Sequence, residues 1–274
     1  MNGYRIFKRL LAAFAFLTIC PMPRGLEMDE GDIGRSRAFF PVVGLAVGAV
    51  NICIVLLLGR ITPLIAAAVL VAAGVLLTRG LHIDGLADLF DALGGGKTRE
   101  RALEIMRDSS IGAFGAAAVV LTLLLKYAAV STFLMSAAFH SGFSAWEDPH
   151  RYAVLVIPPV VGRWCMVWLI QFFPYAREKG KGTAFKERRN LPDLLSAGAI
   201  AACVCSIFSG TAGVLVMAAA TLAAHIFGAA VSRRLGGLTG DVYGAAYEIA
   251  ETVLFLSLAV ASASGILVPS QIPG

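Results

Sequence analysis

Three aspartates stand about one helical turn apart in a segment that directly follows a long apolar run. Asp84, Asp88 and Asp91 occupy positions i, i+4 and i+7, which places them within a narrow arc of one helix face. Carboxylates this close repel one another unless a cation or added protons relieve the repulsion. Hard oxygen ligands suit Mg²⁺, which usually keeps water and substrate phosphates in its shell. The spacing predicts a Mg²⁺ site; the alternative is a solvated acidic helix face, which the apolar residues around the rest of the helix disfavour.

A further set of charges follows in the same connection. The glycines Gly94–Gly96 predict a helix end, and Thr98 is expected to cap a next helix over 99–108. This helix presents ionisable side chains on one broad face: Arg101, Glu104, Arg107 and Asp108. One interpretation is ion pairing on a surface helix. The other is a second wall of the site, where Arg107 and Arg101 bind phosphate and substrate and Glu104 or Asp108 adds a metal ligand.

A second acidic group lies near the C-terminus. Asp241, Glu248 and Glu251 are separated by seven and three residues, so one helix face can present all three. Asp241 alone could also be a helix N-cap. Glu248 and Glu251 enter an apolar run, where unpaired acids are costly, so a functional site is favoured. We expect the two acidic groups to belong to one site, with Glu248 or Glu251 within roughly 10 Å of Asp84 or Asp88, so that one hydrated Mg²⁺ links them.

Two cations lie inside apolar runs. Lys126 falls within 111–138 and Arg163 within 152–173. Charges at such depth usually face a polar interior. Arg163 is expected either to pair with a buried acid or to line a substrate cavity, and Lys126 is a candidate phosphate ligand. His82 lies on the side of its helix opposite Asp84 and is expected to be a packed histidine, or one that supports a metal ligand, rather than a metal ligand itself.

The elements that carry these residues are membrane helices. Of the 274 residues, 58% are hydrophobic and 15% charged, and the mean hydropathy is +0.77. This composition excludes a typical cytosolic globule, a disordered chain and a disulfide-rich secreted module. The net charge of +5 gives no indication of a nucleic-acid partner. Apolar runs cover 5–20, 38–58, 61–78, 111–138, 152–173, 194–208, 211–230 and 248–268. We expect an all-α, polytopic membrane protein with a single integral membrane domain over 1–274.

The basic residues set the topology. Lys and Arg concentrate in 21–37, 79–110, 174–193 and 231–247, which the positive-inside rule places in the cytoplasm. The seven runs from residue 38 onward then alternate consistently. The run 5–20 breaks this alternation, so we expect a short interfacial helix there, with a true span as the alternative. The chain is thus expected to be a multi-pass protein of the cell (inner) membrane, with its site on the cytoplasmic loops 79–110, 174–193 and 231–247.

The motifs resemble a known family. Gly80–Asp88 and Arg99–Gly115 are similar to the corresponding stretches of cobalamin synthases, the adenosylcobinamide-GDP ribazoletransferases. Further agreement follows in order along nearly the whole chain: Thr18–Pro23, Phe40–Gly44, Tyr175–Arg177 with Gly180, and Gly236–Asp241 with Glu248 and Glu251. Two residues depart from the usual pattern: Ile83, where the family often has Leu, and Ser110, where it often has Arg. The second departure leaves Arg107 as the better phosphate candidate.

The resemblance implies a Mg²⁺-dependent membrane enzyme late in cobalamin synthesis. Such an enzyme joins adenosylcobinamide-GDP to α-ribazole or its 5′-phosphate, giving adenosylcobalamin or its 5′-phosphate and GMP. Its partners are these substrates and membrane lipid, without nucleic acid, and the oligomeric state stays open. Two rivals are a membrane phosphotransferase of the CDP-alcohol type, whose Asp/Gly/Ala-Arg spacing is absent here, and a cation-coupled transporter.

Together, residues and resemblance give each candidate a role. The expected catalytic residues are Asp84, Asp88, Glu248 and Arg107. The expected substrate-binding residues are Arg101, Lys126, Arg163, Arg177 and Asp241, with Arg177 placed by the resemblance. The expected metal ligands are Asp84, Asp88, Asp91, Glu104, Asp108 and Glu251.

Overall fold

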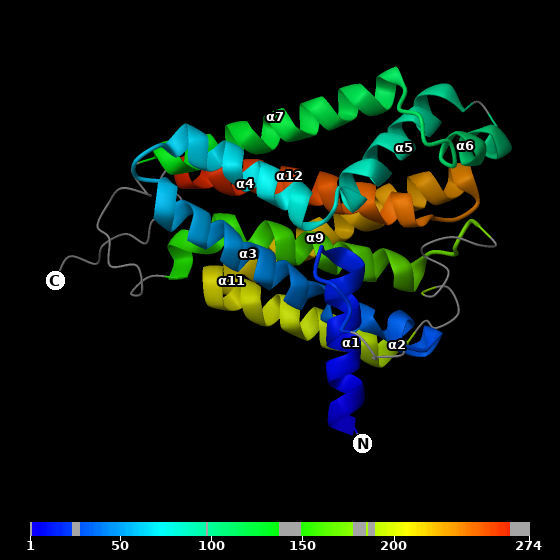
Figure 1. Ribbon diagram of the computed structural model, residues 1–274, viewed down its shortest axis with the longest axis horizontal. Helices are drawn as coiled ribbons and strands as arrows, with labels where there is room; N and C mark the ends of the chain where they lie inside the picture. Colours follow the sequence, from blue (N-terminus) through cyan, green and yellow to red (C-terminus); the bar gives the residue numbers. More distant parts are fainter. Residues whose placement is uncertain are drawn as a thin grey trace.

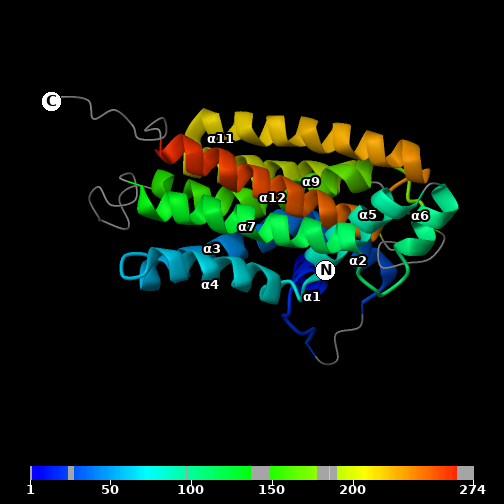
Figure 2. The same cartoon turned by 90° about the horizontal axis from the view of Figure 1, so that it is seen from above.

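The chain forms a bundle of long helices that share one axis (Figures 1 and 2). The computed structural model describes residues 2–23, 28–96, 98–136, 149–177, 185 and 190–263. The long helices are α3 (Phe40–Leu58), α4 (Pro63–Leu77), α7 (Ala113–Met135), α9 (Ala153–Phe172), α11 (Leu191–Leu235) and α12 (Gly240–Ala263). The shorter ones are α1 (Asn2–Leu17), α2 (Glu30–Arg35), η1 (Ser36–Phe39), α5 (Leu81–Gly95), α6 (Arg99–Ile105) and η2 (Pro149–Tyr152). The predicted all-α class is confirmed over the described residues.

Helix α9 forms the centre of the bundle. Nearly all of its residues are buried, and it packs against α3, α11 and α12. A helix that is apolar on every side is stable only when other helices or lipid surround it. The outer helices meet this need on one side and leave apolar side chains exposed on the other, among them Leu121 and Leu124 of α7 and Leu215 and Leu222 of α11. In a membrane, lipid covers those side chains.

Helix α11 contains two arms. Its backbone leaves helical geometry at Ser209 and Gly210, and Gly213 abuts the backbone of Cys205. Residues eight apart in a continuous helix would be about 12 Å apart along the axis. The chain therefore folds back here, and the arms correspond to the predicted runs 194–208 and 211–230.

The number of spans follows from length and composition. Five helices are long and apolar enough to cross a membrane, or six if α4 and α5 form one broken span. In that count α11 is a single helix of 45 residues. The chain is a polytopic helical membrane protein, and seven spans stay a prediction.

Helix α1 runs across the bundle rather than along it (Figure 1). Its C-terminal end is fixed to the α4–α5 junction, because Arg79 Nη2 donates to the Ala15 carbonyl at 3.0 Å and Ile19 N donates to the Leu77 carbonyl at 2.8 Å. Lys8 pairs with Asp32 at 3.1 Å and so joins α1 to α2. This crosswise orientation favours the predicted interfacial helix over a further span.

A sharp bend separates α5 from α4. The two helices meet at 85°, and the turn contains consecutive left-handed residues, Arg79 (φ 54°) and Gly80 (φ 67°). Positive φ is unusual for arginine and carries strain. Because of the bend, α5 leaves the bundle axis and packs on α12 and α7. The first acidic motif therefore lies at one end of the bundle.

Candidate active site

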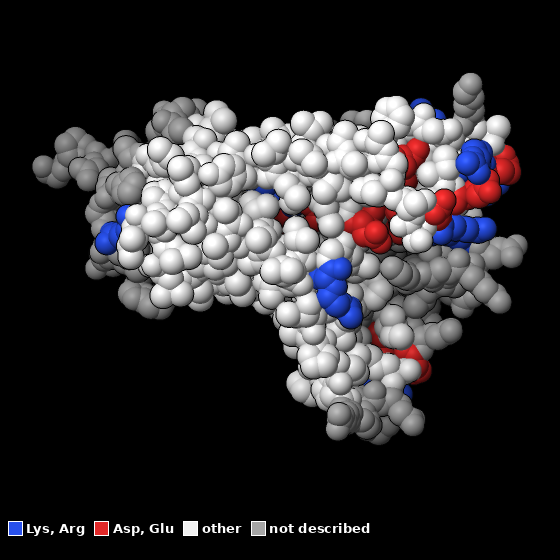
Figure 3. Space-filling view, turned by 45° about the horizontal axis from the view of Figure 1, so that its top comes forward, with Lys and Arg blue, Asp and Glu red and all other residues white. Residues whose placement is uncertain are grey.

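The three predicted loops meet at this end of the molecule. Arg177 pairs with Asp241 at 2.9 Å and donates to the Met106 carbonyl at 3.0 Å. Arg234 donates to the carbonyls of Leu93 and Gly96 at 2.8 and 3.0 Å, a favourable place for a cation because helix α5 ends there. Figure 3 shows red and blue side chains gathered towards this end, while the flank of the bundle is mostly white. Residues 178–184 and 186–189 of the second loop lie outside the described residues.

Helix α5 touches the start of α12 through a glycine. A Cβ atom at Gly85 would lie only 2.6 Å from the carbonyl oxygen of Asp241, so the two backbones are in direct contact. Asp84 and Asp241 line the same small pocket. Asp84 is exposed and Asp88 is half-buried. The structure thus brings the first acidic motif next to Asp241, although Asp84 and Asp241 are 157 residues apart in the chain.

Asp91 has a different task from the one expected. Its two carboxylate oxygens accept hydrogen bonds from the backbone N–H groups of Gly112 and Gly115, at 2.7 and 2.8 Å. These N–H groups lie at the start of α7, where backbone N–H groups have no carbonyl partner within the helix and need another acceptor. Asp91 therefore fixes α7 against α5, and we do not include it among the proposed metal ligands.

The face of α6 shows the surface pairing that was one of the two interpretations. Arg101 binds Glu104 at 2.7 Å, and both side chains are exposed. Asp108 accepts hydrogen bonds from the side chain and the backbone N–H of Ser110, which lower the pKa of this carboxyl. Arg107 is exposed. Its expected role as a phosphate ligand stays a prediction.

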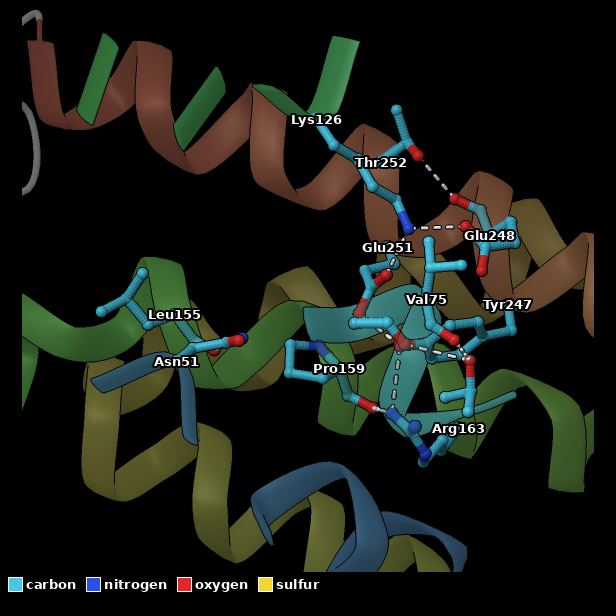
Figure 4. A network of polar contacts seen from close by, with 12 residues as sticks. Asn51, Val75, Lys126, Leu155, Pro159, Arg163, Tyr247, Glu248, Glu251 and Thr252 are labelled. Atoms are coloured by element: carbon cyan, nitrogen blue, oxygen red, sulfur yellow. Dashed lines mark hydrogen bonds and ion pairs between the residues drawn. The ribbon is translucent and has the colours of Figure 1, made fainter. Parts of the chain in front are cut away.

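The charges in the bundle interior form a network of their own (Figure 4). Lys126 of α7 binds Glu248 at 2.6 Å and also contacts Glu251 of α12. The Tyr247 hydroxyl bonds to Glu251, and Arg163 Nη1 donates to Tyr247 Oη at 3.1 Å. The guanidinium of Arg163 lies over the Tyr247 ring, 4.6 Å from its centroid. These side chains are all buried, so two cations and two carboxylates neutralise one another away from water.

This network changes the roles expected for its members. Lys126 pairs with Glu248 and Glu251 and lines a small pocket together with them. Arg163 donates to the Pro159 carbonyl and to the Tyr247 hydroxyl, so its hydrogen-bond partners differ from the buried acid that was one of the two expectations. Glu248 and Glu251 bind Lys126, and among the described residues no three His, Cys, Asp or Glu side chains gather closely enough to hold a metal. The expected link from Glu248 or Glu251 to Asp84 or Asp88 through one Mg²⁺ stays a prediction, and both glutamates are already paired with Lys126.

Asp84 and Asp88 nevertheless fit a divalent cation as a donor set. Mg²⁺ is commonly held by one or two carboxylates, with substrate phosphates and water filling its other positions. Both carboxylates lie on α5 one turn apart, and Asp84 lines a pocket together with Asp241. A diphosphate substrate would thus supply the oxygens that the protein lacks.

Two pockets flank Asp84. The smaller one also contains His82, Asp241 and Tyr243. The larger one measures about 790 Å³ and lies between the end of α1, the α4–α5 bend and α7. His82 is buried, with its ring 4.2 Å from that of Tyr247, which confirms a packed histidine.

The sequence interpretation missed Arg79, Arg234 and Tyr247. A basic residue before Gly80 was the available signal for Arg79, and a cation close to a glycine-marked helix end was the signal for Arg234. The position of Tyr247 one turn before Glu251 could have suggested their contact.

The comparisons with known proteins give the family of the chain. The family described as cobalamin-5-phosphate synthase matches residues 9–259. The chain belongs to that family. The match includes both carboxylate motifs, the interior network and most of α1.

Relatives cover nearly the full chain. An adenosylcobinamide-GDP ribazoletransferase from Roseiflexus sp. (strain RS-1) is 38% identical, over 95% of this chain and 92% of the relative. A protein with the same description from Desulfitobacterium hafniense is 36% identical, over 91% of this chain and 95% of the relative. Another from Syntrophobacter fumaroxidans is 40% identical, over 90% of this chain and 96% of the relative. No solved structure matches the chain.

Proposed function

We propose that this protein is an adenosylcobinamide-GDP ribazoletransferase. It joins adenosylcobinamide-GDP to α-ribazole or its 5′-phosphate and releases GMP. The observation that carries the proposal is the family match over residues 9–259. The shared pocket of Asp84 and Asp241 at the charged end of the bundle, with Arg177 paired to Asp241, supports it, because diphosphate chemistry needs oxygen ligands and cations together.

Mg²⁺ would be held by Asp84 and Asp88. When bound there it would neutralise charge on the diphosphate, the usual requirement of phosphoryl transfer. Arg107 is the proposed phosphate ligand, since its side chain is exposed just after α6, a helix that packs on α5. Arg177 acts on the site through its ion pair with Asp241, which fixes that carboxylate next to α5.

In the proposed reaction, a ribose hydroxyl oxygen of α-ribazole forms a new bond to the phosphorus attached to cobinamide. The bond from this phosphorus to the bridging oxygen breaks, and GMP leaves with that oxygen. The hydroxyl proton passes to a carboxylate at the site, for which Asp241 and Asp84 are the candidates. Holding both reactants in line accounts for much of the acceleration in such reactions.

The proposed location is the inner membrane. The site would face the cytoplasm, from which Mg²⁺ would reach it. The basic residues of the three connections support this side. Contact with lipid is supported by exposed apolar side chains on α1, including Tyr4, Ile6 and Phe7.

The test is a turnover assay with the purified full chain in detergent. With Mg²⁺, adenosylcobinamide-GDP and α-ribazole, we expect GMP and a cobalamin product in equal amounts. A parallel reaction with CDP-diacylglycerol and an alcohol acceptor should release no CMP. CMP release without GMP release would overturn the proposal in favour of the CDP-alcohol class. GMP release without any sealed compartment would exclude transport as the only activity.

A further inference from the structure

The larger pocket beside Asp84 has the form of a small-molecule site. Its volume of about 790 Å³ lies within the range of roughly 300–1,000 Å³ that is usual for such sites. Most of its lining is apolar, and the charged residues in it are Arg79 and Asp84. Apolar walls with a few polar groups at one side suit an amphipathic ligand with an aromatic part.

The walls come from three separate parts of the chain. Ala15 and Phe16 contribute from α1, Ile83 and Ala87 from α5, and Val119 from α7. The wall formed by α1 is held in place by the hydrogen bond from Arg79 to the Ala15 carbonyl. Arg79 makes this bond from a left-handed backbone conformation. Such strain persists only where the surrounding structure over-determines it, and it is concentrated at functional sites.

Asp84 connects this pocket to the reaction site. It lines both pockets, so a ligand in the larger one touches the carboxylate that also lies beside Asp241. A group at the inner edge of the ligand would therefore be presented to the diphosphate site. The opposite, apolar end of the ligand would lie against Phe16, Ile83 and Val119.

We propose that the larger pocket binds α-ribazole, with its apolar benzimidazole base against α1 and α7 and its ribose at Asp84. This assignment rests on the proposed function and deepens it by giving the nucleoside its own subsite. The corrin ring is much larger and too polar at its edge for these walls. It would lie outside, on the charged end of the bundle.

The test fills the pocket from one wall and measures both substrates. Val119→Trp on α7 places a large ring in the pocket, and Ala15→Trp does the same from α1. Val120→Trp is the matched control, because Val120 is the next residue and its side chain is exposed on the bundle flank. The variants are purified as full chains in lipid nanodiscs, and KM is measured for each substrate together with equilibrium binding of α-ribazole.

We expect each filling variant to raise KM and Kd for α-ribazole roughly tenfold or more, as loss of a pocket for an apolar group does. KM for adenosylcobinamide-GDP should stay within about twofold, because that substrate binds elsewhere. Val120→Trp should behave as wild type.

Three results would contradict the assignment in distinguishable ways. If the wild type turns over and the filling variants leave both KM values unchanged, the pocket holds lipid or nothing relevant to the reaction. If they raise KM for adenosylcobinamide-GDP instead, the pocket belongs to the other substrate. If the wild type neither turns over nor binds α-ribazole, the proposed function fails together with the subsite.

Discussion

At the scale of single residues, carboxylates of similar spacing have different tasks. Asp84 and Asp88 line the open end of the bundle, whereas Asp91 accepts backbone hydrogen bonds from the start of α7. Spacing alone groups the three, because it reports only the shared helix face. What separates them is the neighbouring element: α7 begins beside Asp91, and α12 begins beside Asp84.

Because of this difference, the same Asp→Asn substitution should affect activity at two of these positions and stability at the third. Asp84→Asn and Asp88→Asn should each lower kcat by roughly a hundredfold or more, since charge at the diphosphate is lost. Asp91→Asn should keep more activity and lower the melting temperature, because a helix cap contributes about 1 kcal/mol to the free energy of unfolding. Turnover assays and thermal unfolding in detergent check both. Near-normal rates for Asp84→Asn at saturating Mg²⁺ would refute the metal assignment.

The interior network gives a prediction about stability. Lys126→Met leaves Glu248 and Glu251 buried without their cation, so the free energy of unfolding should fall by about 3–5 kcal/mol. Adding Glu248→Gln and Glu251→Gln to this variant should recover most of the loss. Thermal unfolding of the single and triple variants measures the loss of stability and its recovery. If Lys126→Met melts like the wild type and only binds substrate more weakly, Lys126 is a phosphate ligand after all.

At the scale of elements, the site depends on the contact between α5 and α12. Gly85→Ala should push these helices apart, because the added Cβ would lie 2.6 and 2.8 Å from Asp241 backbone atoms. We expect turnover to fall more than about tenfold, although alanine normally favours a helix by about 1 kcal/mol over glycine.

Gly74→Ala on α4 is the matched control, since a Cβ there meets nothing within 4 Å. It should leave activity unchanged. Equal activity for Gly85→Ala and Gly74→Ala would show that the α5–α12 contact does not position the site.

Most of the elements could be predicted from the sequence, while some of their contacts could not. Apolar runs and glycine-marked ends are local signals, so the ends of α3, α7 and α9 lie within three residues of the ends of the predicted runs 38–58, 111–138 and 152–173. Pairing of Lys126 with Glu248 depends on which helices become neighbours across 122 positions of chain, and no local pattern encodes that. The topology predicted that both acidic groups lie at one end of the bundle, and Asp84 and Asp241 line one pocket there.

At the scale of the whole molecule, the charged end must face one side of the membrane. In a background without the native cysteines, Glu100→Cys and Arg233→Cys should react with a membrane-impermeant maleimide only from the cytoplasm. Ile61→Cys, in the loop between α3 and α4, should react only from the opposite side, since α3 runs away from the charged end. Labelling of Glu100→Cys and Arg233→Cys from different sides would contradict the placement of both residues at the same end of the bundle.

The most direct test of the account is a cryo-electron microscopy structure of the full chain with adenosylcobinamide-GDP and Mg²⁺, without α-ribazole. We predict density for the diphosphate beside Asp84 and Asp88, bordered by Arg107 and Asp241, with the larger pocket still free of the corrinoid. The network of Lys126, Glu248 and Glu251 should be unchanged. A diphosphate bound to Lys126 in the bundle interior, or far from α5, would contradict the account.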